Sequence, residues 1–380
     1  MKKYLILTLA SLLALAACSK VAPVSETAQR EISFQVANYV QTKATTGVKY
    51  YEDGTFGTYA WFNAADPFMV NEEVGLSGNV WKTLRNTFYW PKTGSIDFIS
   101  FSPYAANPEV KLTDGTYSMT FGDYTVIPEQ AAAQSNDATA AAAVSAYSLD
   151  LMYADLATAS ENKDDIQDNG IQGSNDSGYK GVPTLFRHAL AKVSFSIQAN
   201  FLEVTATNAD QSTSKTTWEI TLNKAQLQGY KNQGTLALDW DKTNGKWNGS
   251  WVAGENAEDQ TLVLKENLQL TTSPQDLKTD LFMLPQVFAD RAQQLALDFT
   301  IKTTLANGNV INESYSTAID LKTITNEWKM NQITNYIIKI KPTASDDTNP
   351  RPDTPEDVVI TFDPAVVDWN SADADLTLQI

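Results

Sequence analysis

Alternating apolar and polar residues predict β-strands along most of this chain. The run from Glu31 to Val36 alternates strictly, so Ile32, Phe34 and Val36 would share one face of a half-buried strand. Similar short runs recur downstream, with proline or glycine commonly at their ends. Strands are predicted at residues 59–63, 68–70, 81–90, 95–102, 115–126, 186–197, 218–222, 235–239, 260–264, 281–284, 295–303, 310–319, 333–340 and 358–362. This pattern predicts an all-β fold built of β-sandwiches.

Three stretches interrupt the strand pattern. Residues 130–160 are rich in alanine, and a short helix or ordered loop is expected near Tyr147 to Ala154. Residues 161–180 are polar and contain three glycines, which favours a surface loop. Residues 341–356 contain four prolines and are typical of a linker.

The length of the chain predicts more than one domain, because 380 residues exceed what one hydrophobic core usually organises. We place the boundary near residue 185, after the polar loop. The expected units are an N-terminal domain at 44–185 and a C-terminal domain at 186–380.

The first residues predict an exported lipoprotein. Lys2 and Lys3 precede an apolar run, Tyr4 to Ala17, that is too short to span a bilayer and fits a secretory signal peptide. Leu15-Ala16-Ala17-Cys18 is a lipobox, so residues 1–18 are the expected signal segment and Cys18 the expected site of acylation, with palmitate as the fatty acid. Cys18 is the only cysteine, which excludes a disulfide within the chain.

Charge and residue counts exclude several classes of function. The chain has 28 Lys and Arg against 45 Asp and Glu, a net charge of −17 that disfavours binding to nucleic acid or anionic lipid headgroups. The single histidine, His188, lies in an apolar segment and is expected to be a structural, hydrogen-bonded residue. One histidine and one cysteine exclude the usual zinc sites, and Asp164 to Gly170 lacks the ligand spacing of an EF-hand. No enzyme activity, metal or cofactor is expected.

The tryptophans leave a second interpretation open. Trp240, Trp247 and Trp251 are among nine tryptophans that could stack on sugar rings, although packing within strands is the simpler role. A surface lipoprotein that binds glycans and stays on the membrane is therefore the alternative function. A glycosidase with two acidic residues is a weaker third hypothesis, because no acidic pair stands out.

Several phrases, in order along the chain, resemble the fimbrillin family of Bacteroidales pilins. They cover nearly the whole exported chain behind the lipobox, and their order is more specific than any one of them. The phrases are Phe88-Tyr89-Trp90-Pro91, Ile96-Asp97-Phe98-Ile99-Ser100-Phe101-Ser102-Pro103, Asp150-Leu151-Met152-Tyr153-Ala154, Phe186-Arg187-His188-Ala189-Leu190-Ala191-Lys192-Val193, Met283-Leu284-Pro285-Gln286, Trp328-Lys329-Met330-Asn331, Ile360-Thr361-Phe362-Asp363-Pro364 and Val367-Asp368-Trp369.

This resemblance implies two tandem transthyretin-like β-sandwich domains, with short helical insertions, that assemble into type V fimbriae supporting adhesion. Subunits of that family reach the outer membrane as lipoproteins. A trypsin-like protease then removes the first strand, and a strand of another subunit takes its place by donor-strand exchange. The implied partners are other fimbrial subunits, the protease and a surface receptor that the sequence does not identify.

The residues of this chain fit that scheme at three places. Residues 19–43 would be a propeptide containing the removable strand of Ile32, Phe34 and Val36. Cleavage is expected between Lys43 and Ala44, although the family commonly has arginine at this site, and Arg30 is the alternative. The candidate donor strand is 366–380, in which alternate residues face one way. These are Leu376, Leu378 and Ile380. A stalk subunit is favoured, and an anchor or tip subunit stays open.

Overall fold

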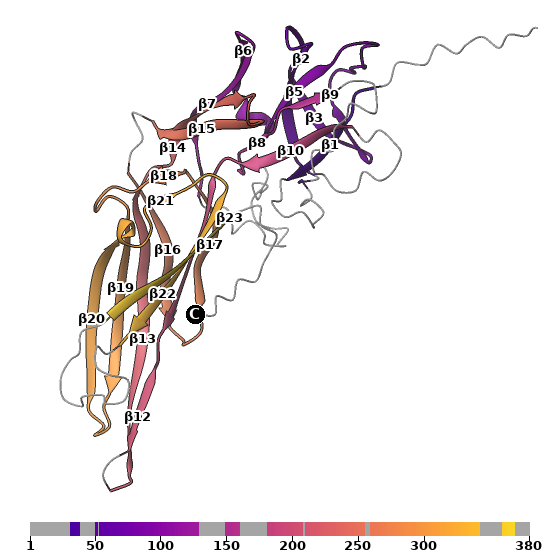
Figure 1. Cartoon of the computed structure of the whole chain (residues 1–380). Helices are drawn as coiled ribbons and strands as arrows, with labels where there is room; N and C mark the ends of the chain where they lie inside the picture. Colours follow the sequence, from indigo (N-terminus) through magenta and orange to yellow (C-terminus); the bar gives the residue numbers. More distant parts are fainter. Residues whose placement is uncertain are drawn as a thin grey trace, which may run out of the picture.

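The computed structural model describes residues 31–38, 50–51, 53–128, 149–159, 181–207, 210–254, 259–342 and 359–368, and these are almost entirely β-strand (Figure 1). The predicted all-β fold class is therefore confirmed. The helical turns within these ranges are two 3-10 turns, η1 (Tyr104–Ala106) and η5 (Leu321–Thr323). Most of the strands fall into three regions: a ring of strands, a sheet that covers it and a two-sheet C-terminal region.

The first region is a sheet whose pairings close into a ring. The order is β2-β3-β4-β1-β10-β8-β5, and β5 pairs back with β2, while β9 pairs with the remaining part of β5. Closure satisfies the backbone of strands that would otherwise be free edges. The strands are β1 (Phe34–Asn38), β2 (Thr55–Phe62), β3 (Asp66–Ser77), β4 (Val80–Thr83), β5 (Ile96–Ser102), β8 (Met152–Ala154), β9 (Ala157–Ala159) and β10 (Val182–His188).

A second, four-stranded sheet covers one outer face of this ring. Its order is β15-β14-β7-β6, so a hairpin from residues 233–253 pairs with strands from residues 109–125. Between the two sheets lies an apolar core that includes Ile99 and Phe101 of the ring. The strands are β6 (Glu109–Thr113), β7 (Thr116–Thr125), β14 (Gln233–Asp241) and β15 (Lys246–Ala253).

Strand β5 shows why the ring is rigid there, because all seven of its residues are buried. Ile96 and Phe98 face the interior of the ring, whereas Ile99 and Phe101 face the covering sheet. A strand buried on both faces needs apolar side chains in both directions. Gly57 on the neighbouring strand leaves room for the Phe101 ring, since a Cβ there would lie 2.1 Å from it.

The third region, here called the C-terminal sandwich, consists of two facing sheets with one core. One sheet has the order β17-β11-β22-β23; in the other, β13 pairs with β12 and β16 on one side and with β19, then β20, on the other. The strands are β11 (Ala191–Ala199), β12 (Glu203–Thr207), β13 (Thr213–Tyr230), β16 (Gln260–Gln269), β17 (Gln275–Met283), β19 (Gln294–Thr304), β20 (Val310–Asp320), β22 (Gln332–Lys341) and β23 (Val359–Asp368).

The C-terminal sandwich forms the long lower part of the molecule in Figure 1. Its core takes alternate residues from both sheets. Phe195 of β11 stacks on Tyr336 of β22 at 5.0 Å in one sheet, and Leu222 of β13 and Phe299 of β19 come from the other. A two-stranded sheet, β18 (Gln286–Val287) and β21 (Glu327–Trp328), lies between it and the covering sheet in Figure 1.

Three sequence predictions about single elements are wrong. The helix or loop expected near Tyr147 to Ala154 ends in a strand, since Met152–Ala154 is β8 paired with β5 and β10, whereas Leu149 to Leu151 lie outside any strand. The single strand expected at 186–197 is two strands, β10 and β11, separated at Ala189 and Leu190 and placed in different sheets. The strand expected at 81–90 ends at Thr83. The division into tandem domains remains a proposal.

Candidate functional site

The first strand, β1, is one of the strands of the ring and lies between β10 and β4. These two neighbours pair with it to unequal extents. All five residues of β1 pair in parallel with Val182 to Phe186 of β10. On the other side only Phe34 pairs with Trp81 of β4. The residues just before β1 add the Ile32 amide, which donates to the Phe88 carbonyl at 2.9 Å, and a bridge between Glu31 and Tyr89.

The side chains of this segment fill the interior of the ring. Ile32 and Phe34 are 1% and 2% exposed, and Val36 is half-buried. The Phe34 ring meets Phe56 and Phe98 edge-on at centroid distances of 5.7 and 5.8 Å. Edge-on aromatic pairs add to the free energy of burial itself. The segment is therefore held mainly by its side chains and by one ladder of hydrogen bonds.

Gly181, at the start of β10, marks where the backbone of β1 comes closest. Its φ is +115°, and a Cβ at this position would lie 2.6–2.8 Å from backbone atoms of Phe34. Only glycine tolerates both the dihedral angle and the contact. The Val182 amide then donates to the Ser33 carbonyl at 2.7 Å.

Tyr50 packs in the interior of the ring, in the same cluster of buried side chains as Phe34. Its ring stacks on Phe186 at 5.0 Å and meets Trp81 edge-on at 5.3 Å. Its hydroxyl lies 2.8 Å from the Ser102 hydroxyl. Tyr50 thus contacts both strands that flank β1, so its packing does not depend on β1 alone.

Tyr51 forms a polar cluster with the buried residues Asp150 and His188. Its hydroxyl donates to Asp150 Oδ2 at 3.0 Å, and His188 Nδ1 lies 2.9 Å from Asp150 Oδ1. Because an ionised carboxylate only accepts, Nδ1 carries the proton of this bond. Burial raises the pKa of Tyr51, and the nearby Asp150 charge raises it further. Burial, and then Asp150, also raise the pKa of Tyr124 to about 12. His188 is thus a hydrogen-bonded structural residue, as expected.

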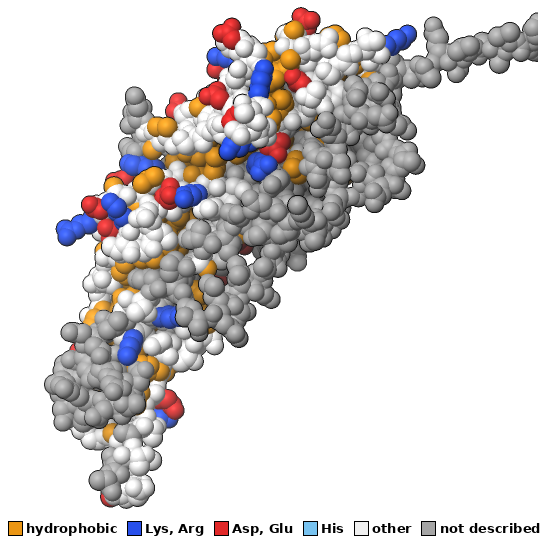
Figure 2. Space-filling view, viewed as in Figure 1, with side chains coloured by type: hydrophobic (Ala, Val, Ile, Leu, Met, Phe, Trp, Pro, Cys, Tyr) orange, Lys and Arg blue, Asp and Glu red, His pale blue; other side chains and the backbone are white. Residues whose placement is uncertain are grey.

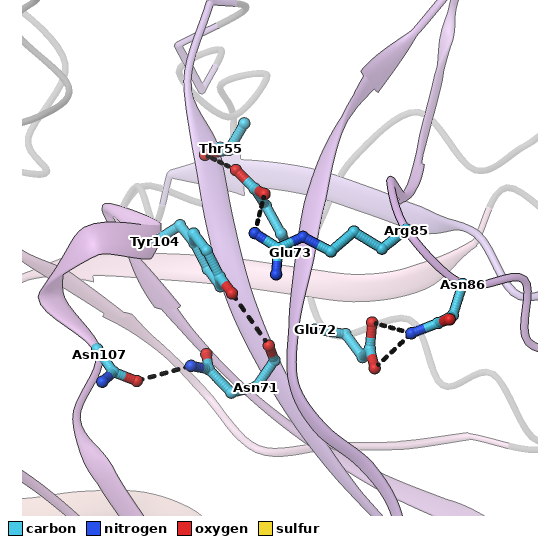
Figure 3. A network of polar contacts seen from close by, with 8 residues as sticks. All are labelled: Thr55, Asn71, Glu72, Glu73, Arg85, Asn86, Tyr104 and Asn107. Atoms are coloured by element: carbon cyan, nitrogen blue, oxygen red, sulfur yellow. Dashed lines mark hydrogen bonds and ion pairs between the residues drawn. The ribbon is translucent and has the colours of Figure 1, made fainter.

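A surface network outside the ring ties β3 to its neighbours (Figure 3). Arg85 Nη2 lies 3.5 Å from Glu73 Oε2, and Thr55 donates to the same carboxylate at 3.1 Å. Asn71 donates to the Asn107 side chain at 2.6 Å. These contacts are exposed or half-exposed, so each adds little to stability.

The remaining predicted site residues lie outside the described residues. This holds for Cys18, Arg30, Lys43, Ala44, Leu376, Leu378 and Ile380. Of the candidate donor segment 366–380, Val366, Val367 and Asp368 are described. They pair with Thr334, Ile333 and Gln332 of β22 within the chain.

The described part of the chain offers no metal site and no membrane helix. No group of three or more His, Cys, Asp or Glu side chains there could hold a metal ion. In the same ranges, no helix combines the length and the apolar character needed to cross a bilayer. On the face shown in Figure 2, acidic and basic side chains are interspersed rather than gathered by sign.

The tryptophans considered for glycan stacking take part in packing. Trp247 is 7% exposed and its indole N–H donates to the Ala154 carbonyl at 2.8 Å. The Trp251 indole N–H donates to the Ala189 carbonyl at 2.6 Å. Trp240 meets Trp247 edge-on at 5.3 Å. These residues therefore hold the β14–β15 hairpin against the ring and the chain after β10.

Sequence reasoning found the strand at 32–36 but missed its surroundings. β10 was expected to begin at Phe186, although Val182 to Phe186 are the residues that pair with β1. One feature of the sequence could have indicated this pairing, namely Gly181 before an apolar run. An isolated glycine beside a strand often marks a close approach of another backbone. Tyr50 had no local sign, because its contacts come from Trp81, Ser102 and Phe186.

Comparison with known proteins gives one family. The family model described as fimbrillin-like matches residues 40–369. No curated protein matches the chain at a significant level. Among solved structures, a fimbrial protein from Bacteroides vulgatus has 14% sequence identity and a TM-score of 0.49, with 90% of this chain and 99% of that chain covered. A candidate cell adhesion protein from Bacteroides uniformis has 16% identity and a TM-score of 0.42, with 90% and 98% covered.

The family match spans most of the chain and includes the ring strands from β2 onward, the covering sheet and the C-terminal sandwich. The family consists of structural pilus subunits found in cell-surface fimbriae. The chain belongs to the fimbrillin-like family and is a fimbrial subunit.

Proposed function

We propose that this fimbrial subunit is exported as a lipoprotein acylated at Cys18 and matures by losing its first strand. Cleavage between Lys43 and Ala44 releases the lipid anchor together with Ile32, Phe34 and Val36. The vacated place in the ring then accepts a strand of another subunit, and repetition of this step builds a fimbrium that supports adhesion.

The observation that carries the proposal is the position of β1. Removing a strand from within a closed ring leaves two unpaired edges, on β10 and β4, and a cavity where Phe34 was. Unpaired edges bind an added strand by main-chain hydrogen bonds, while the cavity selects its side chains. Burial of Ile32 and Phe34 contributes about 1.5–3 kcal/mol each, and an incoming strand would recover this free energy.

The unequal pairing of β1 supports its removal. Only Phe34 pairs with β4, whereas five residues pair with β10. Once the chain is cut between Lys43 and Ala44, this short strand is no longer covalently linked to the ring, whereas Tyr50 stays in the mature chain. The packing of Tyr50 against Phe186 and Trp81 keeps β2 in place when β1 leaves.

We assign Leu376, Leu378 and Ile380 as the donor residues. Their spacing matches that of Ile32, Phe34 and Val36, so three alternate side chains can enter the ring from one face. Contact between the end of one subunit and the ring of the next is head-to-tail and does not close on itself, so it produces a filament.

The test combines processing with assembly. Limited trypsin treatment of the purified chain should convert monomers into filaments visible by electron microscopy, and the subunits in them should begin at Ala44. Lys43→Ala should block this conversion. Arg30→Ala is the matched control and should leave it unchanged, whereas the reverse result would move the cleavage site to Arg30.

The donor assignment has its own test. Deletion of residues 375–380 should give a chain that folds and is cut normally but forms no filaments. Normal filaments from this truncation would defeat the donor assignment without affecting the removal of β1. Intact mass distinguishes the proposal from the glycan-binding and anchor alternatives, because a subunit of either alternative kind would keep acylated Cys18 and β1 at the surface.

A further inference from the structure

We propose that β20 is a self-association edge, at which two copies of this chain pair antiparallel and join their C-terminal sandwiches into one continuous sheet. This inference does not depend on strand removal or on the donor assignment. It begins from a difference between β20 and the other edges of the sandwich (Figure 1).

The other edge strands of the C-terminal sandwich carry features that hinder pairing with a foreign strand. β12 is only five residues long, and β23 contains Pro364, which lacks an amide hydrogen. β16 and β17 have register shifts against their neighbours, and each contains a residue with positive φ, Asn267 or Asp280. Proline, bulges and short length are the usual means of protecting an exposed edge.

β20 has none of these features. It runs for eleven residues and pairs with β19 at every position without a register shift. It contains no proline, lysine or arginine, and within the described residues no strand pairs with its other side. A long, regular edge without these features is a template for another strand, although Glu313 on the core-facing row is a charge of the kind that hinders such pairing.

The direction of the free backbone groups follows from two bonds that flank the strand. The Leu321 amide donates to the Gln293 carbonyl and the Leu305 amide to the Asn309 carbonyl, each at 2.9 Å. Both fit the register in which odd-numbered residues of β20 bond to β19. The amides and carbonyls of the even-numbered residues from Asn312 to Ala318 therefore point away from β19, toward the free edge.

The core beneath this edge is also incompletely covered. The core-facing residues of β19, from Leu295 to Ile301, are at most 2% exposed. The corresponding residues of β20, including Tyr315 and Ile319, pack on the same core but stay half-exposed. One further strand beside β20 would cover this row, and a second β20 would bring Ile311, Tyr315 and Ile319 to it, together with Glu313 and Thr317.

A second β20 fits the edge better than an arbitrary strand does. Antiparallel pairing over the full strand sets Tyr315 opposite Tyr315 of the other copy on the two-fold axis. Even-numbered residues then face even-numbered ones, so the free amides and carbonyls meet as hydrogen-bonded pairs. Ile311 lies opposite Ile319, and Ser314 opposite Ser316. Glu313 faces Thr317, so no like charges oppose each other across the contact.

The contact should be weak and dependent on salt. A single strand pair buries less than the roughly 1,200 Å² typical of stable complexes, so dissociation in the micromolar range or weaker is expected. The net charge of −17 makes two copies repel each other, and screening by salt should strengthen the dimer.

Sedimentation equilibrium of the full chain carrying Cys18→Ser tests the proposal. The mean mass should rise from monomer toward dimer with concentration, and more so at higher ionic strength. Ser314→Lys should reduce association at least tenfold, because lysine protects an edge. Thr205→Lys on the β12 edge is the control with the same charge change and should associate normally. A monomer at every concentration, or equal loss in both variants, would overturn the proposal.

Cross-linking tests the register independently of affinity. In the same Cys18→Ser background, Tyr315→Cys places two sulfurs across the two-fold axis, at a Cα distance of about 4.5 Å that suits a disulfide. A mixture of Ser314→Cys and Ser316→Cys chains should cross-link to each other faster than either chain does alone, without change to the core. Absence of both cross-links would overturn the proposal. This is also the result expected if residues 343–358 of the same chain, rather than a second copy, occupy the edge.

Discussion

The first and last strands of the described chain, β1 and β23, are held in opposite ways. β1 lies inside a closed ring, with five parallel pairs on one side, a single pair on the other and a phenylalanine in the core. β23 lies at the edge of a sheet, with ten antiparallel pairs to β22 in unbroken register. Loss of β23 would expose an edge, whereas loss of β1 would open a ring and leave a cavity.

This difference supports the proposal that β1 is the strand to be exchanged. An edge strand can be added or lost without changing the strands beside it. A strand inside a ring leaves a site with two edges and a shaped interior, which only another strand of matching side chains can fill.

The largest effect is expected for Phe34→Ala in the uncut chain. The cavity should lower the free energy of unfolding by about 3–5 kcal/mol, whereas Ile360→Ala on half-buried β23 should cost about 1 kcal/mol. Denaturant unfolding measures both. In assembled fimbriae Phe34→Ala should have no effect, because the residue has been removed; an equal loss there would mean that β1 stays in place.

The buried Asp150–His188 contact should come next. His188→Leu leaves the Asp150 carboxylate buried without its histidine partner, and we expect a loss of about 3 kcal/mol in urea unfolding. Lys302→Ala removes an exposed ion pair to Glu219 in the C-terminal sandwich and should change stability by less than about 0.5 kcal/mol. Similar losses in the two variants would contradict the assigned difference in burial.

Gly181→Ala should cost about 2 kcal/mol through strain and contact with β1. Gly308→Ala is matched to it, because Gly308 also has positive φ, +85°, but nothing within 4 Å of an added Cβ. The additional loss of unfolding free energy in Gly181→Ala, relative to Gly308→Ala, measures the effect of the close contact with Phe34. That excess should shrink when β1 is removed, and an unchanged excess would argue against the contact as its cause.

The smallest effect concerns alkaline pH. Burial raises the pKa of Tyr51, and the pKa of both Tyr124 and Tyr153 rises to about 12, so the folded state holds these protons when an unfolded tyrosine loses them near about pH 10. Stability is therefore full below about pH 10 and falls as pH rises above it. The melting temperature should therefore fall at alkaline pH, and Tyr51→Phe should reduce this fall. An unchanged fall in Tyr51→Phe would contradict the role of Tyr51.

The sequence predicted single strands well and their partners poorly. Strict alternation identified the segment around Phe34 and most of β19, β20 and β22, because one face of each is buried. β15 was missed, since Asn248 and Gly249 interrupt its pattern. The short β8 was read with the alanine-rich stretch before it, and its strand form depends on pairing with β5 and β10.

The site could be predicted only in part for the same reason. Ile32, Phe34 and Val36 were identified from their own alternation. The parallel pairing with β10, the contact of Gly181 with Phe34 and the role of Tyr50 depend on residues far away in sequence, and no local pattern contains them. Local periodicity therefore indicates which side chains are buried, but not which strands bury them.

The central claim is that the mature fimbrium contains this subunit without β1, with another copy's strand in its place. Intact mass spectrometry of subunits extracted from purified fimbriae tests it most directly. The account predicts a mass that begins at Ala44 and lacks the lipid on Cys18. A mass that retains Ile32 to Val36 in assembled subunits would contradict it.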